Sequence, residues 1–207
     1  MLSHALTIVS NELHGHLATY GPPTTVGLGN LSEGLGANPP SVPRGILNLS
    51  VVNIKEEKAL KNLPNVVRND ATLRAVYENP PVFLNFHILL TATHTSYSDA
   101  LLVLSRAIRF FQFKNVFTQD NVAPASLTTD APNNQLDQLA SFKLIFDLYS
   151  PTMEEVNHLW GTLGGKQYPF VLYILRMLDL KFRAVQSESG LITEVISEFH
   201  HKDPAAN

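Results

Sequence analysis

The chain contains no cysteine among its 207 residues. This absence excludes disulfide bonds, thiolate metal sites and cysteine nucleophiles, and it leaves the redox compartment undetermined. Charge is also scarce, because charged residues make up 16% of the chain, against roughly a quarter in ordinary soluble domains. The 15 basic and 18 acidic residues leave a net charge of -3. Such a balance offers no electrostatic footprint for nucleic acid or an anionic membrane, so we expect neither as a partner.

Long apolar runs are missing as well. No stretch reaches the roughly 18 apolar residues of a membrane span, so we expect no direct membrane insertion. The first residues, MLSHALTIVSNEL, lack the basic start of a secretion signal, and we expect a chain that is cytoplasmic when made. Apolar residues nevertheless make up 44% of the chain. With so little charge, an unusual share of the surface is neutral or buried, which favours contacts between subunits.

Three segments have the pattern of helices. The first 20 residues carry leucines and Val9 at intervals of three and four, which predicts an amphipathic helix. A second helix is predicted from an N-cap at Ser98 to about Lys114, with a stripe formed by Leu101, Leu104, Ile108 and Phe111. The third is short: Thr152 and Glu155 form a capping box, and two glycines, Gly164 and Gly165, stop the helix.

Strands are predicted where β-branched and aromatic residues gather. The expected segments are 24–29, 46–54, 82–94, 139–148, 170–185 and, as a strand or an arm, 191–199. A polar, turn-rich connection at 118–137 lies between the second helix and the strand 139–148, and its length is typical of connections that are often functional or partly mobile. Helices and strands do not alternate regularly, so we predict an α+β fold. It has a mainly antiparallel sheet of about four to six strands, with two long helices and one short helix packed on it.

The domain organisation predicted from length is one main domain with an appendage. We place the main domain at 1–187 and a C-terminal strand or arm with a frayed tail at 188–207. Within the main domain, the segment 170–180 is apolar on both faces apart from Arg176 and Asp179. A strand of that kind is covered on both sides, by helices or by another subunit.

A glycine-rich stretch, Gly161 to Lys166, resembles a nucleotide-phosphate loop at first sight. In the register of that motif, Trp160 stands where the first glycine belongs and Gln167 where the metal-binding hydroxyl belongs. The order of elements also differs, because a phosphate loop leads from a strand into a helix. We therefore interpret the glycines as a helix stop and Trp160 as a core side chain.

No set of residues supports a catalytic mechanism. The eight histidines do not form a recognisable metal-binding pattern, and no G-x-S-x-G nucleophile elbow occurs. We predict a protein that is not an enzyme and holds no cofactor or metal. Two alternatives stay open: a small nucleotide- or metal-dependent enzyme built on the glycine-rich loops, and a generic assembly adaptor. The mixed-charge run that contains Lys55 and Lys58 is a solvated segment or a rim contact to a partner.

Several short motifs, taken in order, resemble one family. They are Gly-Asn-Leu-Ser at 29–32, Val-Asn-Ile followed by Leu-Lys-Asn within 52–62, Asn-Pro-Pro-Val at 79–82, Phe-Phe-Gln with Val-Phe-Thr within 110–118, and Asn-x-Leu-Trp-Gly-x-Leu-Gly-Gly-Lys from 157. The ordered set covers about nine tenths of the chain. It is similar to the sheath-cap proteins, or tail terminators, of extracellular contractile injection systems, phage-tail-like particles of the antifeeding-prophage type.

The resemblance implies a structural ring, expected to be hexameric, that ends sheath and inner-tube polymerisation and tethers the last sheath layer. Its partners would be copies of itself, the sheath protein and the inner-tube protein, in a particle that is released or held at a membrane. We expect Pro80, Pro81 and Trp160 to be structural anchors. The candidate interface comprises Lys55, Lys58, Gly164, Gly165, Lys166, Gln167, Tyr168 and Arg176.

Overall fold

The structure is a computed structural model. It describes residues 1–20, 24–33, 42–60, 64, 66–69, 74–77, 79, 81–139, 141–180, 187–190 and 195–197. The chain divides into two compact units. Unit 1 comprises Met1–Lys61 and Val82–Leu180, and unit 2 comprises Asn62–Pro81 and Lys181–Asn207.

Unit 1 is built on a six-stranded mixed sheet with the order β1-β2-β5-β8-β7-β6. The strands are β1 (Val26–Leu28), β2 (Leu47–Glu56), β5 (Val82–Ala92), β6 (Val116–Thr118), β7 (Lys143–Tyr149) and β8 (Phe170–Leu180). β1 pairs parallel with β2, and every other pair is antiparallel. The two central strands, β5 and β8, have 11 residues each. They are paired with each other in the middle of the sheet and form the centre of the unit.

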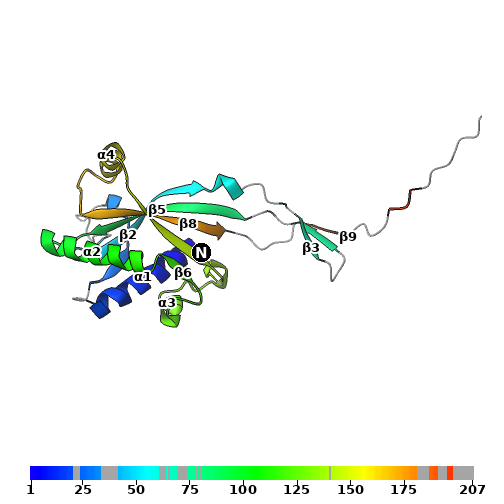
Figure 1. Cartoon of the computed structure of the whole chain (residues 1–207), viewed down its shortest axis with the longest axis horizontal. Coiled ribbons are helices and arrows are strands. Elements are labelled where there is room, and N and C mark those ends of the chain that lie inside the picture. The colour runs from blue at the N-terminus through cyan, green and yellow to red at the C-terminus, as the bar shows by residue number, and fades with distance from the viewer. Residues whose placement is uncertain are drawn as a thin grey trace, which may run out of the picture. The chain divides into compact units, whose positions relative to one another are not determined.

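Helices cover both faces of this sheet (Figure 1). On one face lie α1 (Leu2–Tyr20) and α2 (Tyr97–Phe113), with α3 (Pro124–Thr128) beside them. The opposite face carries α4 (Met153–Thr162). Short 3-10 turns occur at η1 (Leu31–Glu33), η2 (Lys58–Leu60) and η3 (Gln135–Asp137).

The main core lies between α1, α2 and the sheet. Alternate residues of the central strands face it, including Phe86 and Leu175, which are fully buried. Phe111 of α2 contacts rings on β7 and β8, with centroids 5.0 Å from Phe146 and 4.6 Å from Tyr173. A second core lies under α4, where Trp160 and Val156 pack with Leu31, Val42, Ile46, Leu89 and Leu172. From Phe170 to Leu175, the doubly apolar strand β8 is thus covered on both faces, as its sequence predicts.

Unit 2 contains a separate three-stranded antiparallel sheet. Its order is β3 (Val66–Asn69), β4 (Arg74–Tyr77) and β9 (Ser187–Gly190). β4 is the central strand, and its Ala75 is buried. None of these strands was expected from the sequence. The predicted boundary between 187 and 188 falls inside this unit, and the division of the chain at that point stays a prediction.

Side chains of helix α1 form hydrogen bonds with the connection that precedes β7. The Leu139 amide donates to His4 Nδ1 at 2.9 Å, and His4 Nε2 lies 3.0 Å from the Leu127 carbonyl oxygen. About two turns further along the helix, Asn11 donates to the Thr129 carbonyl at 3.1 Å. Side chains of one helix therefore satisfy backbone groups of a segment more than a hundred residues away in sequence.

Glu12 completes this attachment with an ion pair. Lys114 Nζ donates to one carboxylate oxygen at 2.7 Å, and the Ala123 amide donates to the other at 2.7 Å. Burial alone would raise the pKa of Glu12, but hydrogen bonds from Lys114, Ser126 and Ala123 outweigh it and lower the pKa. The connection at 118–137 is therefore fixed to α1 and contains the helix α3, which polarity and length did not reveal.

The predicted α+β class and the mainly antiparallel sheet are confirmed, whereas the number of helices differs. Within the described residues there are four α-helices, of 19, 17, 5 and 10 residues, instead of two long and one short. The N-cap of α2 is Ser96, which accepts a hydrogen bond from the Asp99 amide, and not Ser98. Of the four residues in the predicted stripe on α2, Leu104 and Phe111 are buried, whereas Leu101 and Ile108 are exposed.

The stop at the end of α4 is as predicted. Gly164 and Gly165 have φ values of 94° and 77°, which side chains disfavour. The Gly165 amide donates to the Trp160 carbonyl at 2.7 Å. The Thr152–Glu155 capping box is present at the other end of the helix. Both ends of α4 are therefore set by local sequence.

Trp160 anchors α4 to the sheet, so we expect its replacement to weaken the fold. The side chain is 5% exposed and lies 5.3 Å from the Phe170 ring. Trp160→Ala should destabilise the chain by about 3 to 5 kcal/mol and lower the melting temperature by roughly 10 °C. Met153→Ala, on the same helix but 76% exposed, is the matched control and should melt like the parent. Equal melting curves for both variants would show that the α4 core contributes little.

Candidate functional site

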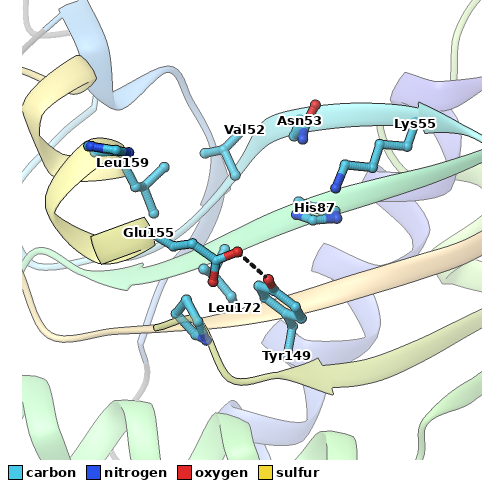
Figure 2. Close-up of a pocket in the computed structure, with 10 residues that line it drawn as sticks. Val52, Asn53, Lys55, His87, Tyr149, Glu155, Leu159 and Leu172 are labelled. Carbon is cyan, nitrogen blue, oxygen red and sulfur yellow. Dashed lines mark hydrogen bonds between the residues drawn. The ribbon is translucent and has the colours of Figure 1, made fainter. Parts of the chain in front are cut away.

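A hollow of about 260 Å³ lies on the α4 side of the sheet. We call it the α4 hollow (Figure 2). Strands β2, β5, β7 and β8 supply its floor and α4 forms one wall, as the labelled side chains show. Its lining residues are Val52, Asn53, Lys55, His87, Tyr149, Pro151, Glu155, His158, Leu159 and Leu172.

A carboxylate and a phenol meet at one side of the hollow. The Tyr149 hydroxyl donates to one oxygen of Glu155 at 2.9 Å, and the Thr152 amide donates to the other at 2.9 Å. The bond from Thr152 is the largest cause that lowers the pKa of Glu155, and Tyr149 adds to it. The same bond to Glu155 raises the pKa of Tyr149. Glu155 is therefore ionised at neutral pH, with both oxygens engaged.

The imidazole of His87 lies in the middle of the hollow, between charges of opposite sign. Its ring centroid is 5.3 Å from that of Tyr149. Burial lowers the pKa of His87, the nearby Lys55 ammonium lowers it further, and Glu155 opposes both by raising it. His87 is consequently neutral at neutral pH, and its charge responds to any change in the two neighbours.

Farther along the same face of the sheet, the charged groups are paired. Arg176 on β8 forms an ion pair with Asp147 on β7. Glu57 accepts a hydrogen bond from Asn85 on β5 at 2.9 Å. Outside the hollow, these polar side chains on the sheet face therefore have hydrogen-bond or ion-pair partners.

The candidate interface residues fall into two groups. Lys55 lines the hollow, Arg176 is exposed on the same face, and Lys58 is exposed in the turn that follows β2. The second group is the turn 164–168, which follows α4, where Lys166 and its neighbours are exposed. The structure therefore brings together Lys55 and Arg176 on one face. The sequence analysis did not select His87, Tyr149 or Glu155 as site residues, because their meeting depends on strand pairing.

The expected anchors have different environments. Trp160 is buried and contacts Phe170 and Tyr168, with ring centroids 5.3 and 6.2 Å away. Pro81 is half-buried, whereas Pro80 lies outside the described residues. The anchoring roles of the two prolines stay predictions.

A second candidate surface is the outer side of α2. Five large apolar side chains are exposed on this one helix, and the end residues Tyr97 and Phe113 are 69% and 81% exposed. We call this set the α2 face: Tyr97, Leu101, Leu102, Ile108 and Phe113. Spacings of four and seven residues place Tyr97, Leu101 and Ile108 in one stripe and Leu102 and Phe113 near Arg109 in the next. Apolar side chains gathered in this way typically mark a surface that another molecule covers.

The segment that follows α2 is acidic, whereas α2 itself carries the basic residues Arg106 and Arg109. Between Lys114 and Lys143 the only charged residues are Asp120, Asp130 and Asp137, and all three are exposed. We call this segment, 115–142, the acidic connection. Leu136, beside Asp137, is 74% exposed. The acidic connection therefore presents apolar and acidic groups together.

The described part of the chain shows no arrangement typical of a metal enzyme or a membrane span. No group of three or more metal-ligating side chains occurs among the described residues. None of their helices combines the length and the apolar character needed to cross a bilayer. The glycines of the supposed phosphate loop follow helix α4 and precede strand β8, which is the reverse of the order that phosphate binding requires.

Comparison with known proteins identifies a family and solved structures of similar fold. Residues 6–194 match the model of the Pvc16 N-terminal domain. Over 100% of its length the chain is similar to the PVC sheath/tube terminator of an extracellular contractile injection system, in the extended state, with a TM-score of 0.62 at 13% identity. The chain spans 65% of the length of that protein.

A further solved structure is the anti-feeding prophage cap, a tube terminating cap. The likeness has a TM-score of 0.47 at 14% identity, and it covers 74% of this chain and 49% of that one. A search of curated protein sequences finds no match.

The geometry of the α4 hollow predicts how His87 titrates. Its pKa should lie below the usual value of 6.5. Lys55→Gln should raise that pKa by removing a repelling charge, and Glu155→Gln should lower it by removing an attracting one. Side-chain NMR titrations of the purified variants measure both shifts, with Lys58→Gln as a control that leaves the His87 pKa unchanged. A fall in the pKa on removal of the Lys55 charge would contradict the arrangement.

Proposed function

The chain belongs to the Pvc16 N-terminal domain family, and from this premise we propose that it is a structural cap of a contractile injection particle. In this role it ends polymerisation of the sheath and the inner tube and tethers the last sheath layer. The observation that carries the proposal is the family match over residues 6–194. The fold likeness to a sheath/tube terminator along the whole chain supports it.

The proposed role is mechanical and involves no chemical step. The described residues hold no metal-ligating cluster, and the charged groups on the sheet face are mostly engaged with one another. We assign the chain no cofactor and no enzymatic activity. Its place of work is an assembled phage-tail-like particle, which it joins after synthesis in the cytoplasm and which is released or held at a membrane.

We further propose that the chain forms a homo-oligomeric ring, with six copies as the expected number. The α2 face supplies apolar area for a contact between subunits. Arg106 and Arg109 lie beside it and form no ion pair with a described residue. Asp130 and Asp137 of the acidic connection are likewise without an ion pair in the described part of the chain. We assign the contact to the α2 face of one copy and the acidic connection of the next, a head-to-tail arrangement that closes into a ring.

The turn after α4 is the surface that we assign to the sheath. Lys166 and Gln167 are exposed there, while Tyr168 is held against Trp160. Gly164 and Gly165 fix the path of the backbone. Lys166 thus lies in a turn that its neighbours anchor to the core. We assign its side chain to a contact with a carboxylate of a partner. An exposed pair of this kind contributes roughly 0.2 to 1 kcal/mol, so it acts through repetition around the ring.

The proposed role predicts co-purification with sheath and tube proteins from cells that make the whole particle. Lys166→Glu should retain less sheath protein, and it should produce particles of irregular length in electron micrographs. Its melting temperature should stay within about 2 °C of the parent, because surface changes usually shift stability by about 0.5 kcal/mol or less.

Lys143→Glu is the control for this experiment, because Lys143 is an exposed lysine at the start of β7. It should leave sheath retention and particle length unchanged. Failure of the parent chain to retain sheath or tube protein would refute the cap proposal. Normal lengths with Lys166→Glu would remove only the assignment of this turn.

The head-to-tail contact predicts a rescue by charge exchange. Arg106→Glu with Arg109→Glu should weaken ring formation on the order of tenfold, since two pairs become repulsive. Asp130→Arg with Asp137→Arg should weaken it similarly. The four changes together restore opposite charges and should restore the ring, as measured by light scattering over a range of concentrations.

A separate variant tests the apolar part of this contact. Phe113→Ser should weaken the ring while the thermal stability of the monomer is kept, because Phe113 is exposed. A fourfold charge variant that stays dissociated, while each double variant folds normally, would rule out the pairing of these two surfaces.

A further inference from the structure

The described side chains of the α4 hollow include several nitrogen donors without a partner but no carboxylate without a partner. Within the described residues, the side chains of Lys55, His87, Asn53 and His158 make no hydrogen bond or ion pair. The one carboxylate, Glu155, has both oxygens occupied, by Tyr149 and by the capping amide of Thr152. The hollow therefore presents unused nitrogen donors and no unused carboxylate (Figure 2).

The rest of this sheet face differs from the hollow. Arg176 is paired with Asp147, and Glu57 with Asn85. Free donors are therefore concentrated beside α4. Lys55 and His87 both influence Glu155 electrostatically, yet neither bonds to it. An additional acceptor placed between Lys55 and His87 would find two donors without displacing an existing bond.

The size and the apolar lining of the hollow limit which kind of hydrogen-bond acceptor fits it. Its volume is about 260 Å³, whereas a water molecule occupies about 30 Å³ of liquid. Val52, Leu159 and Leu172 line the same space with apolar atoms. A carboxylate alone would leave this apolar lining bare, whereas an acidic side chain brings methylene groups and neighbouring residues that cover it.

From these observations we propose that the α4 hollow is a docking site for an acidic side chain on a segment of a partner protein. The carboxylate lies between the Lys55 ammonium and the His87 ring, and the flanking residues of the segment cover Val52, Leu159 and Leu172. A carboxylate at this position favours protonation of His87, so docking is coupled to proton uptake. The proposal adds a binding site to the cap and does not depend on the ring.

Two blocked pentapeptides test the site, with a glutamate or a glutamine between valines. Binding to the purified full chain is followed by NMR on the His87 ring and on amides around the hollow. The glutamate peptide should bind at least about tenfold more tightly than the glutamine peptide, because charge-assisted hydrogen bonds to the carboxylate are lost in the latter. The glutamate peptide should also raise the His87 pKa, and its binding should be tighter at about pH 6 than at about pH 8.

The pH dependence is assigned to His87 with the facing groups known. They are Lys55 on β2, Tyr149 on β7, and Glu155 and His158 on α4. His87→Gln should therefore remove most of the change with pH while some binding through Lys55 remains. His158→Gln should keep the pH dependence.

Variants of Lys55 separate a built site from a general charge effect. Lys55→Gln should lower the affinity for the glutamate peptide about tenfold, and Lys55→Arg should restore part of it. Lys58→Gln, which changes a lysine outside the hollow, should bind like the parent. Equal affinity of the two peptides, an unaffected Lys55→Gln variant, or acetate binding as tightly as the glutamate peptide would each overturn the proposal. None of these outcomes involves particle assembly, so they leave the cap role to its own test.

Discussion

The pairing of β5 with β8 is the interaction on which unit 1 depends. Both strands carry apolar side chains on each face, so neither is stable unless two layers of other residues cover the pair. α1 and α2 cover one face. The ten residues of α4 cover only part of the other, and the α4 hollow lies where this cover ends. The position of the proposed docking site thus follows from how little of the sheet one short helix protects.

Charge is distributed unevenly along the chain. The three aspartates of the acidic connection equal the net charge of -3, so the rest of the chain is neutral in sum. The arginines of α2 follow exposed leucines, and Asp137 lies beside the exposed Leu136. An interface that combines apolar area with opposite charges gains attraction from the first and orientation from the second. Low overall charge is compatible with this arrangement, because only the local imbalance matters.

Local signals in the sequence explain which features were predictable. The capping box of Thr152 and Glu155 and the stop at Gly164 act within a few residues, and both ends of α4 were predicted correctly. The cap of α2 was placed two residues late because Ser96 and Ser98 are chemically equivalent candidates. α3 was missed because its stabilising contacts come from α1. The α4 hollow could not be predicted, since four strands and a helix bring its residues together.

The attachment of α1 to the acidic connection has a consequence for the order of events during synthesis. His4 and Glu12 bond to groups that lie between 102 and 135 residues further along the chain. The ribosome synthesises these partner residues after α1 has emerged. Until then, the apolar side of α1 lacks its native neighbours. Closing contacts of such long sequence separation is slow compared with forming a helix. The surface that bears Asp130 and Asp137 is consequently completed only after most of the chain has been made.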